Sequence, residues 1–303
     1  MNYPATVVIT TKNRKEELRT ALQSVLNQTV QVEILVIDDG STDGTSDMVS
    51  RDFPQVRLNR CEKSLGLIEQ RNRGAQMAST PIVISIDDDA TFPTPRIIEQ
   101  TLADIDHPRV GAVAIPLFDV RLGRQLRPPA PMEDTVYVFS EYTGTAHALR
   151  RELFLRAGGY HGFLFRQGEE GDYCARMMNA GYVVRVGRSE PIHHLESPMR
   201  DRTKIIYYQT RNNLLYAWYN VPMPYMPLHL LATTCNSLRA GLQRGYWTAS
   251  FRGIFSGYKD IPHEWPHRAP ITRQTYRLIR RLKAHPATRL EDILPELPPT
   301  MPS

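Results

Sequence analysis

The sequence predicts an α/β fold in which a mostly parallel, twisted sheet carries helices on its faces. Short runs of β-branched and aliphatic residues alternate with stretches whose apolar residues recur at helical spacing. This alternation is typical of strands joined by helical crossovers. The 303-residue chain with 41% hydrophobic residues is also long and apolar enough to bury a sizeable core.

The first half of the chain supplies most of these elements. Apolar runs predict strands at residues 6–10, 33–37, 56–59, 82–86 and 110–115. Apolar residues at 18, 21, 22, 25 and 26 predict a helix after the first strand. Further helices are expected after the turn at 40–45, over 66–77 and over 94–106, where a proline lies in the first turn.

The pattern changes after Pro116. Residues 119–134 are rich in Arg and Pro and are expected to be irregular, and residues 142–146 read as a small-residue loop. Helices are predicted near 151–157, over 168–180 and over 204–219, with a strand at 183–186. Beyond Pro222 the chain is punctuated by prolines, then aromatic, and finally basic.

Composition limits the classes of function. The net charge of +5, from 37 basic and 32 acidic residues, is too mild to indicate a nucleic-acid partner. Three distant cysteines without a CxxC motif argue against a disulfide framework or a structural zinc site. No signal peptide and no apolar run of roughly 18 residues is visible, so we expect a cytoplasmic protein.

Polar or acidic residues follow three of the predicted strands, at 10–14, 38–39 and 87–89. Ligands of such sheets bind beyond the carboxyl ends of the strands, so these residues are expected to meet at one site. Adjacent carboxylates repel one another unless a cation lies between them, and oxygen ligands suit Mg2+ or Mn2+. We therefore expect Asp87 and Asp89 to hold a metal–diphosphate group; the alternative is an exposed acidic turn before Pro93.

These motifs resemble the family 2 glycosyltransferases over roughly residues 5–220. The resemblance rests on the segments 8–14, 36–45, 71–74, 86–89, 158–160 and 168–182 in this order, and more loosely on Arg211 and Asn212, which are similar to the rhamnosyltransferase-like branch. It implies a GT-A fold, a nucleotide-sugar donor, a divalent cation (Mn2+ or Mg2+) and inversion at the anomeric carbon.

The resemblance also assigns site residues. It places Thr10, Thr11, Asn13 and Arg14 along the nucleotide and Asp39 at its base, with Asp38 beside it. Arg71 would lie near the diphosphate or the strand bearing the metal site, Asp87 would face the ribose or metal, and Asp88 is counted with the nucleotide-sugar-binding residues. Asp89 is the expected metal ligand of the DxD motif. A histidine after the last strand often completes the metal site, and either His193 or His194 fits.

The same resemblance suggests the general base. Inverting transfer requires a carboxylate that takes the proton of the acceptor hydroxyl. The family usually has an Asp as the second residue of an acidic pair at a helix start, whereas this chain has Glu169 and Glu170. Glu170 takes that position, with Glu169 and Asp172 as alternatives. Acids in a first helical turn also simply stabilise the helix.

Three parts of the chain are therefore expected: a nucleotide-sugar-binding half at 1–116, an acceptor-binding half at 117–220, and a helical, aromatic and basic extension at 221–303. The acceptor would be a glycan, a lipid-linked sugar or a small molecule. The extension suits either peripheral contact with the inner face of a membrane or a homo-oligomer. The alternatives to a glycosyltransferase are a haloacid-dehalogenase-like phosphatase with Asp87 as nucleophile, and a non-catalytic sugar- or nucleotide-binding module.

Overall fold

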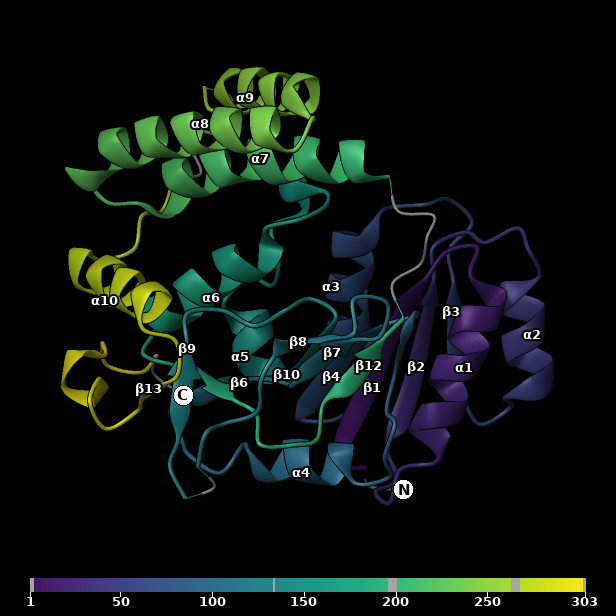
Figure 1. Cartoon of the computed structure of the whole chain (residues 1–303). Helices are drawn as coiled ribbons and strands as arrows, with labels where there is room; N and C mark the ends of the chain where they lie inside the picture. The colour runs from purple at the N-terminus through teal and green to yellow at the C-terminus, as the bar shows by residue number, and fades with distance from the viewer. Residues whose placement is uncertain (1–2, 133, 196–200, 263–267, 302–303) are drawn as a thin grey trace.

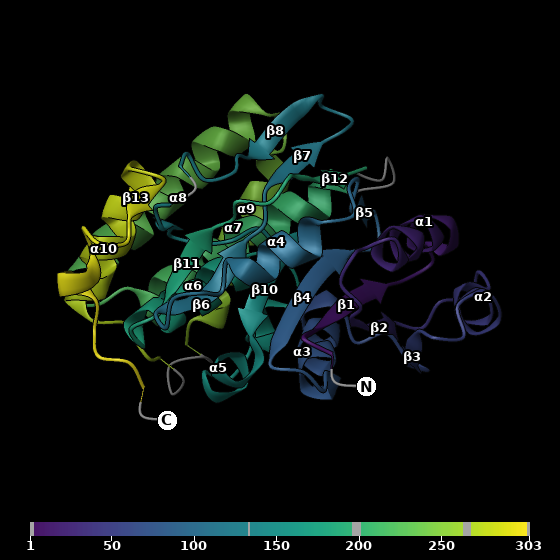
Figure 2. The same ribbon diagram turned by 90° about the horizontal axis from the view of Figure 1, so that it is seen from below.

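The computed structural model describes residues 3–132, 134–195, 201–262 and 268–301. Its centre is a nine-stranded sheet with the strand order β13-β9-β11-β6-β10-β4-β1-β2-β3. The strands are β1 (Ala5–Thr11), β2 (Glu33–Asp38), β3 (Arg57–Arg60), β4 (Ile82–Asp87), β6 (Val110–Ala114), β9 (Tyr137–Phe139), β10 (Ala146–Arg150), β11 (Val183–Val186) and β13 (Thr288–Arg289). Figure 2 shows them fanned from the purple N-terminal strands to β6 and β11.

The α/β fold is confirmed, but the sheet is mixed. Neighbouring strands are parallel from β3 through β2 and β1 to β4, and again between β6 and β11. β10 runs antiparallel between β4 and β6, and β9 and β13 are also antiparallel to their neighbours. β10 begins at Ala146, immediately after the small-residue loop, and was not expected from the sequence.

Helices cover both faces of this sheet (Figure 1). They are α1 (Lys15–Leu26), α2 (Thr45–Asp52), α3 (Leu67–Met77), α4 (Ile97–Ala103), α5 (Arg151–Arg156) and α6 (Glu169–Asn179). Alternate residues of β1 face opposite sides: Val7 and Ile9 pack with the core around α1 and α4, whereas Val8 packs with α3 and α5. The result is a three-layer domain with a core on each side of the sheet.

A smaller four-stranded sheet lies beside the carboxyl end of β4. Its order is β5-β12-β7-β8, from β5 (Ala90–Thr91), β7 (Leu117–Asp119), β8 (Arg124–Arg127) and β12 (Ile192–His194). β12 runs antiparallel to β5, with His194 opposite Ala90. This pairing brings a histidine from late in the chain next to the acidic end of β4.

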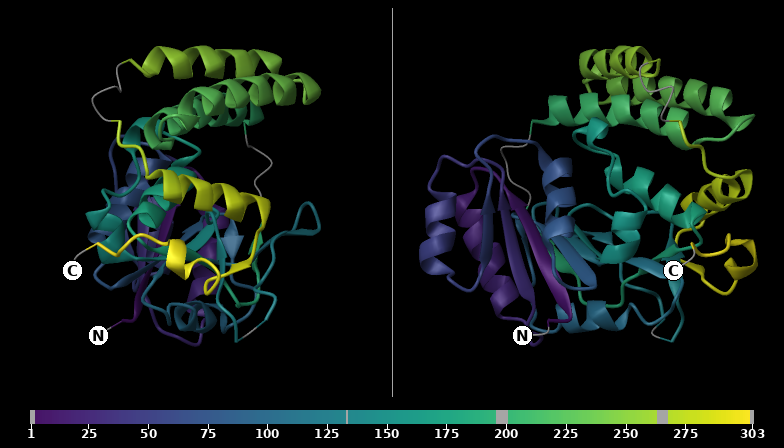
Figure 3. Two further views of the ribbon diagram at one scale, coloured as in Figure 1. Left: turned by 90° about the vertical axis from the view of Figure 1, so that its left-hand side faces the viewer. Right: turned by 180° about the vertical axis from the view of Figure 1, so that it is seen from behind.

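The C-terminal part is helical, as expected. α7 (Arg202–Asn220), α8 (Tyr225–Gln243) and α9 (Trp247–Asp260) form a layer at one end of the molecule, and α10 (Arg273–Ala284) returns to the sheet beside α6 (Figures 1 and 3). α9 packs along α7 so closely that a Cβ at Gly253 would lie 2.6 Å from the Tyr207 carbonyl oxygen. Among the described residues, no helix is both long and apolar enough to cross a bilayer.

Candidate active site

A cavity of about 700 Å³ opens at the carboxyl ends of β1, β2 and β4. We call it the first cavity. Its walls include these predicted nucleotide-binding residues: Thr10, Thr11, Arg14, Asp39, Arg71, Asp87 and Asp88. The expectation that polar strand ends gather at one site is therefore met by the geometry.

Two predicted residues, Asn13 and Asp38, lie outside the walls of the first cavity. Asp38 is fully buried and accepts hydrogen bonds from the backbone N–H of Ser41 and the hydroxyl of Ser46. Asn13 Oδ1 accepts a 2.8 Å bond from the N–H of Thr42. Both side chains hold the loop after β2 in shape, which is the local role that Asp and Asn commonly have in turns.

Asp39 connects β2 to the start of α3. Its carboxylate accepts bonds from the N–H groups of Leu65 and Gly66, the Ser64 hydroxyl and the Gln70 amide, at 2.5–3.2 Å. Burial alone would raise the pKa of Asp39, but these donors hold it below its ordinary value. Asp39 is therefore an ionised group of the site. Its hydrogen bonds fix the segment at residues 64–66, which forms one wall of the first cavity.

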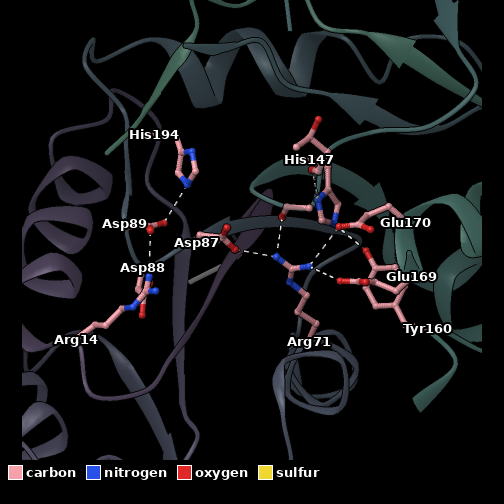
Figure 4. Close-up of polar contacts among 12 residues, drawn as sticks. Arg14, Arg71, Asp87, Asp88, Asp89, His147, Tyr160, Glu169, Glu170 and His194 are labelled. Atoms are coloured by element: carbon pink, nitrogen blue, oxygen red, sulfur yellow. Dashed lines mark hydrogen bonds and ion pairs between the residues drawn. The ribbon is translucent and has the colours of Figure 1, made fainter. Parts of the chain in front are cut away.

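The three acids at the end of β4, Asp87, Asp88 and Asp89, point in different directions (Figure 4). Asp88 accepts 2.8 Å bonds from Thr11 and from Arg14. Arg14 also contacts Asp89 at 3.0 Å, and Asp87 pairs with Arg71 at 2.7 Å. Burial raises the pKa of Asp88 to about 7, against the opposing effects of Arg14 and Thr11. The expected alternative of an exposed turn is excluded, since Asp88 and Asp89 are buried.

Asp87, Asp89 and His194 form a candidate metal centre. Each offers one ligand atom, and these atoms lie within 4.8 Å of one another. His194 Nε2 is 3.4 Å from the buried Oδ1 of Asp89. His193 points elsewhere and packs its ring against Phe118. Two carboxylates and an imidazole suit Mn2+, and Mg2+ accepts the carboxylates, so the residues present fit a divalent cation.

Arg71 lies at the centre of the site. It is a buried residue of α3, so it does not belong to a solvated helix face. Its guanidinium contacts Asp87 at 2.7 Å, Glu169 at 2.8 Å and the carbonyl oxygen of Gly144 at 2.9 Å. Burial alone would lower the pKa of Arg71, but the surrounding carboxylates raise it above its ordinary value. Arg71 therefore connects the acidic end of β4 to the acids of α6.

The three acids at the start of α6 are separated by their surroundings. Glu169 is buried against Arg71. Asp172 contacts Arg176 at 2.9 Å, His161 at 3.0 Å and Asn220 at 2.9 Å. Burial would raise the pKa of Asp172, but these partners lower it to about 2. Asp172 lies outside the walls of both cavities, so its geometry fits a structural role.

Glu170 lies 3.7 Å from Arg71 and keeps 22% of its side chain exposed. Burial and the neighbouring charge of Glu169 raise its pKa, while Arg71 acts in the opposite direction. Gly144 makes room for this carboxylate, because a Cβ there would lie 2.1 Å from Glu170 Oε1. Of the three acids, Glu170 has the freedom to accept a proton from a molecule in the site.

A second cavity, of about 710 Å³, lies between α6, α7, α8 and α10. Its walls carry hydroxyl, amide and basic groups, among them Gln209, Asn213, Thr233, Asn236, Ser237, Arg280 and Lys283. The two cavities share the wall residues Thr143, Gly144, Gln167 and Glu170. Glu170 therefore lies where the two cavities meet.

A buried layer supports this junction. His147 on β10 stacks on Tyr142, with ring centroids 4.1 Å apart, and its Nε2 lies 3.0 Å from the Tyr160 hydroxyl. Burial and then the charge of Arg71 lower the pKa of His147 to about 3, so the imidazole is neutral. It therefore adds no second positive charge next to Arg71.

Sequence reasoning missed the part played by Asn212. This buried residue of α7 places its Nδ2 within 2.6–2.9 Å of the carbonyl oxygens of Leu164, Arg166 and Gln167. That segment lines the first cavity. Its residues Phe165 and Gln167 have φ angles of 59° and 69°, which residues other than glycine rarely adopt. The loose resemblance of Arg211 and Asn212 to the rhamnosyltransferase-like branch gave no indication that Asn212 holds this segment in place.

The model of the family described as "Glycosyl transferase family 2" matches residues 6–167, more than half of the chain. An uncharacterized glycosyltransferase of Haemophilus influenzae is 26% identical over 61% of this chain and 66% of its own length. The chain spans less than two thirds of the first curated relatives it matches.

Solved glycosyltransferases share the fold. A mannosyltransferase of Pyrobaculum calidifontis in complex with GDP-Man and Mn2+ has a TM-score of 0.58 at 18% identity, covering 93% of this chain and 85% of its own. S. aureus TarS 1-349 in complex with UDP-GlcNAc has a TM-score of 0.62 at 15% identity, with 94% and 88% covered. The GT-A architecture and the family match agree, and the chain belongs to glycosyl transferase family 2.

Proposed function

We propose that this protein is a metal-dependent, inverting glycosyltransferase that moves a sugar from a nucleotide-diphosphate donor in the first cavity to an acceptor hydroxyl in the second. One observation carries the proposal: among the described residues, Glu170 is the one carboxylate that belongs to the walls of both cavities. The family membership favours glycosyl transfer over the phosphatase and the binding-module alternatives.

The donor is proposed to be a UDP- or dTDP-sugar whose nucleotide lies along the ends of β1 and β2. Asp87, Asp89 and His194 would hold the cation, which when bound would screen the charge that develops on the leaving diphosphate. Arg71 and Arg14 keep the two aspartates oriented through contacts of 2.7 Å and 3.0 Å. Because both arginines are already paired with carboxylates, they position the metal ligands more than they neutralise the negative charge of the donor diphosphate.

Glu170 is proposed as the general base. An acceptor hydroxyl entering from the second cavity would give its proton to this carboxylate while its oxygen attacks the anomeric carbon. The bond from that carbon to the phosphate oxygen breaks, and the electron pair leaves with the nucleoside diphosphate. A single displacement of this kind inverts the anomeric centre. The raised pKa of Glu170 improves its match to a neutral working pH.

The second cavity is proposed to bind the acceptor. Its hydroxyl and amide lining suits a polyhydroxylated molecule, and Arg280 and Lys283 suit an acceptor with a negative group. A glycan, a lipid-linked sugar and a small-molecule glycoside all meet these requirements. The rhamnosyltransferase-like branch stays a prediction that the donor experiment addresses.

The proposal is tested with UDP-, dTDP- and GDP-sugars, measuring Mn2+-dependent donor hydrolysis and thermal shift. Glu170→Gln is expected to bind the active donor as the wild type does but to lose transfer by about 10²–10⁴-fold, because amides accept protons poorly. Glu169→Gln, which disturbs Arg71, should weaken both properties. Normal transfer by Glu170→Gln would move the base to Glu169 or Asp172.

A further inference from the structure

The two outermost helices present an apolar face that nothing in the described structure covers. It consists of Leu228, Leu231, Leu238 and Leu242 of α8 and Trp247, Phe251, Phe255 and Tyr258 of α9, whose exposed fractions run from 38% to 71%. We call it the α8–α9 face. Soluble monomers rarely expose so many large apolar side chains together, so the face indicates a partner.

The spacing shows that this exposure is organised. Residues 247, 251, 255 and 258 recur every three or four positions and so share one side of α9. The opposite side of α9 consists, apart from Ile254, of small residues, including Gly253 and Gly257, and packs tightly on α7. Large apolar residues therefore point outward and small ones inward, the reverse of an ordinary surface helix.

Charge distinguishes between partners. From residue 201 to residue 260 the chain has seven Arg or Lys residues and two acidic residues, Asp201 and Asp260, which pair with Lys204 and Arg211. Arg239 on α8, Arg244 in the connection and Arg252 on α9 are exposed, and no ion pair among the described residues includes them; Arg244 also lines the second cavity. A two-fold dimer through this face would oppose cations to cations, since both copies use the same patch. An anionic lipid surface complements both the apolar and the basic residues.

We propose that the α8–α9 face docks on the surface of an anionic phospholipid bilayer. Its position agrees with this role, because α8 and α9 form the outermost layer at one end of the molecule in each view (Figures 1 and 3). Trp247 and Tyr258 supply rings with polar edges, which favour the region between headgroups and acyl chains. The apolar side chains would enter the bilayer surface while the arginines contact lipid phosphates.

Docking would also orient the active site. α8 contributes Thr233, Asn236 and Ser237 to the second cavity from the side that does not carry the exposed leucines. The cavity would then lie along the lipid surface, where an acceptor attached to lipid could reach Glu170. This consequence rests on the proposed function, whereas the docking itself does not.

The test is co-sedimentation of the full chain with phosphatidylcholine vesicles that contain or lack phosphatidylglycerol. We expect binding to the anionic vesicles that weakens as salt is raised, and little binding to neutral ones. Leu242→Glu combined with Phe255→Glu should weaken binding at least about tenfold, because two apolar contacts are replaced by charges that the lipid repels. Leu26→Glu combined with Leu122→Glu, also on exposed leucines, should bind like the wild type.

Two results would overturn the proposal. One is absence of binding to anionic vesicles at low salt. The other is a face variant that binds as well as the control variant. A dimer that Leu242→Glu with Phe255→Glu converts to a monomer, without vesicle binding, would assign the face to a second copy instead. Because sedimentation requires no turnover, failure here is distinguishable from failure of the proposed glycosyl transfer, which is measured with a water-soluble acceptor.

Discussion

Replacing Gly144 by alanine tests the position of the proposed base without removing its carboxylate. The added Cβ would lie 2.1 Å from Glu170 Oε1 and 2.8 Å from Arg71 Nη1. Ordinary contact begins near 3.4 Å, so Glu170 must move by more than 1 Å. Arg71 is buried and paired on several sides, whereas Glu170 is partly exposed, so we expect Glu170 to move.

The expected effect is large on turnover and modest on folding. A displacement of about 1 Å in a catalytic group can cost about 100-fold in rate, or roughly 2.7 kcal/mol on the barrier. Overpacking against Arg71 should lower the free energy of unfolding by about 1–3 kcal/mol. Donor affinity should change less than turnover, because the buried and paired Arg71 is expected to stay in place while Glu170 moves.

The assay is a double-mutant cycle of Gly144→Ala and Glu170→Asp, measuring kcat and donor KM in Mn2+ and checking folding by circular dichroism. The shorter aspartate relieves the clash, so the double variant should be no slower than Gly144→Ala alone. A folded Gly144→Ala enzyme with the wild-type kcat would refute the placement of Glu170. Equal and additive losses would show that the two positions act independently.

Three further predictions concern groups around this junction. Asp89→Asn should abolish Mn2+-dependent donor binding in calorimetry while the urea midpoint changes little; unchanged Mn2+ affinity would remove Asp89 from the metal site. The pKa of His147 is about 3 in the folded protein, so below pH 6.5 only the unfolded chain takes up a proton at this residue. The free energy of unfolding of the wild type should therefore fall by up to about 1.4 kcal/mol per pH unit toward pH 4. His147→Gln should flatten this slope in urea titrations. Asn212→Ala should cost about 1–3 kcal/mol of stability and weaken donor binding, because it releases the 164–167 segment. The control Asn213→Ala, at an exposed residue of the same helix, should change stability by under about 0.5 kcal/mol. Equal effects of the two variants would contradict the proposed role of Asn212.

The first half of the fold could be predicted from local patterns. β1, β2 and β4 are apolar runs, and their polar ends meet at one edge because these strands are parallel neighbours. β10 could not be predicted in this way. Its five residues, Ala146–Arg150, include two alanines, a histidine and an arginine, and their burial arises from strands on both sides.

The candidate site needed tertiary information at three points. The choice between His193 and His194 depends on which side of β12 faces the end of β4, and adjacent residues give no such signal. The three acids of α6 share one helical turn, so only their partners on α3, α7 and the 143–145 loop separate the roles of Glu169, Glu170 and Asp172. The second cavity is built by α7, α8 and α10, whose contacts are set by long-range packing.

The most direct test is a crystal structure with Mn2+ and a nucleoside diphosphate, located by the anomalous signal of manganese. The proposed site predicts a manganese peak about 2.2 Å from Asp87, Asp89 and His194, with the nucleotide in the first cavity and Glu170 facing the open side of the diphosphate. Manganese bound away from these three residues, or a nucleotide in the second cavity, would contradict it.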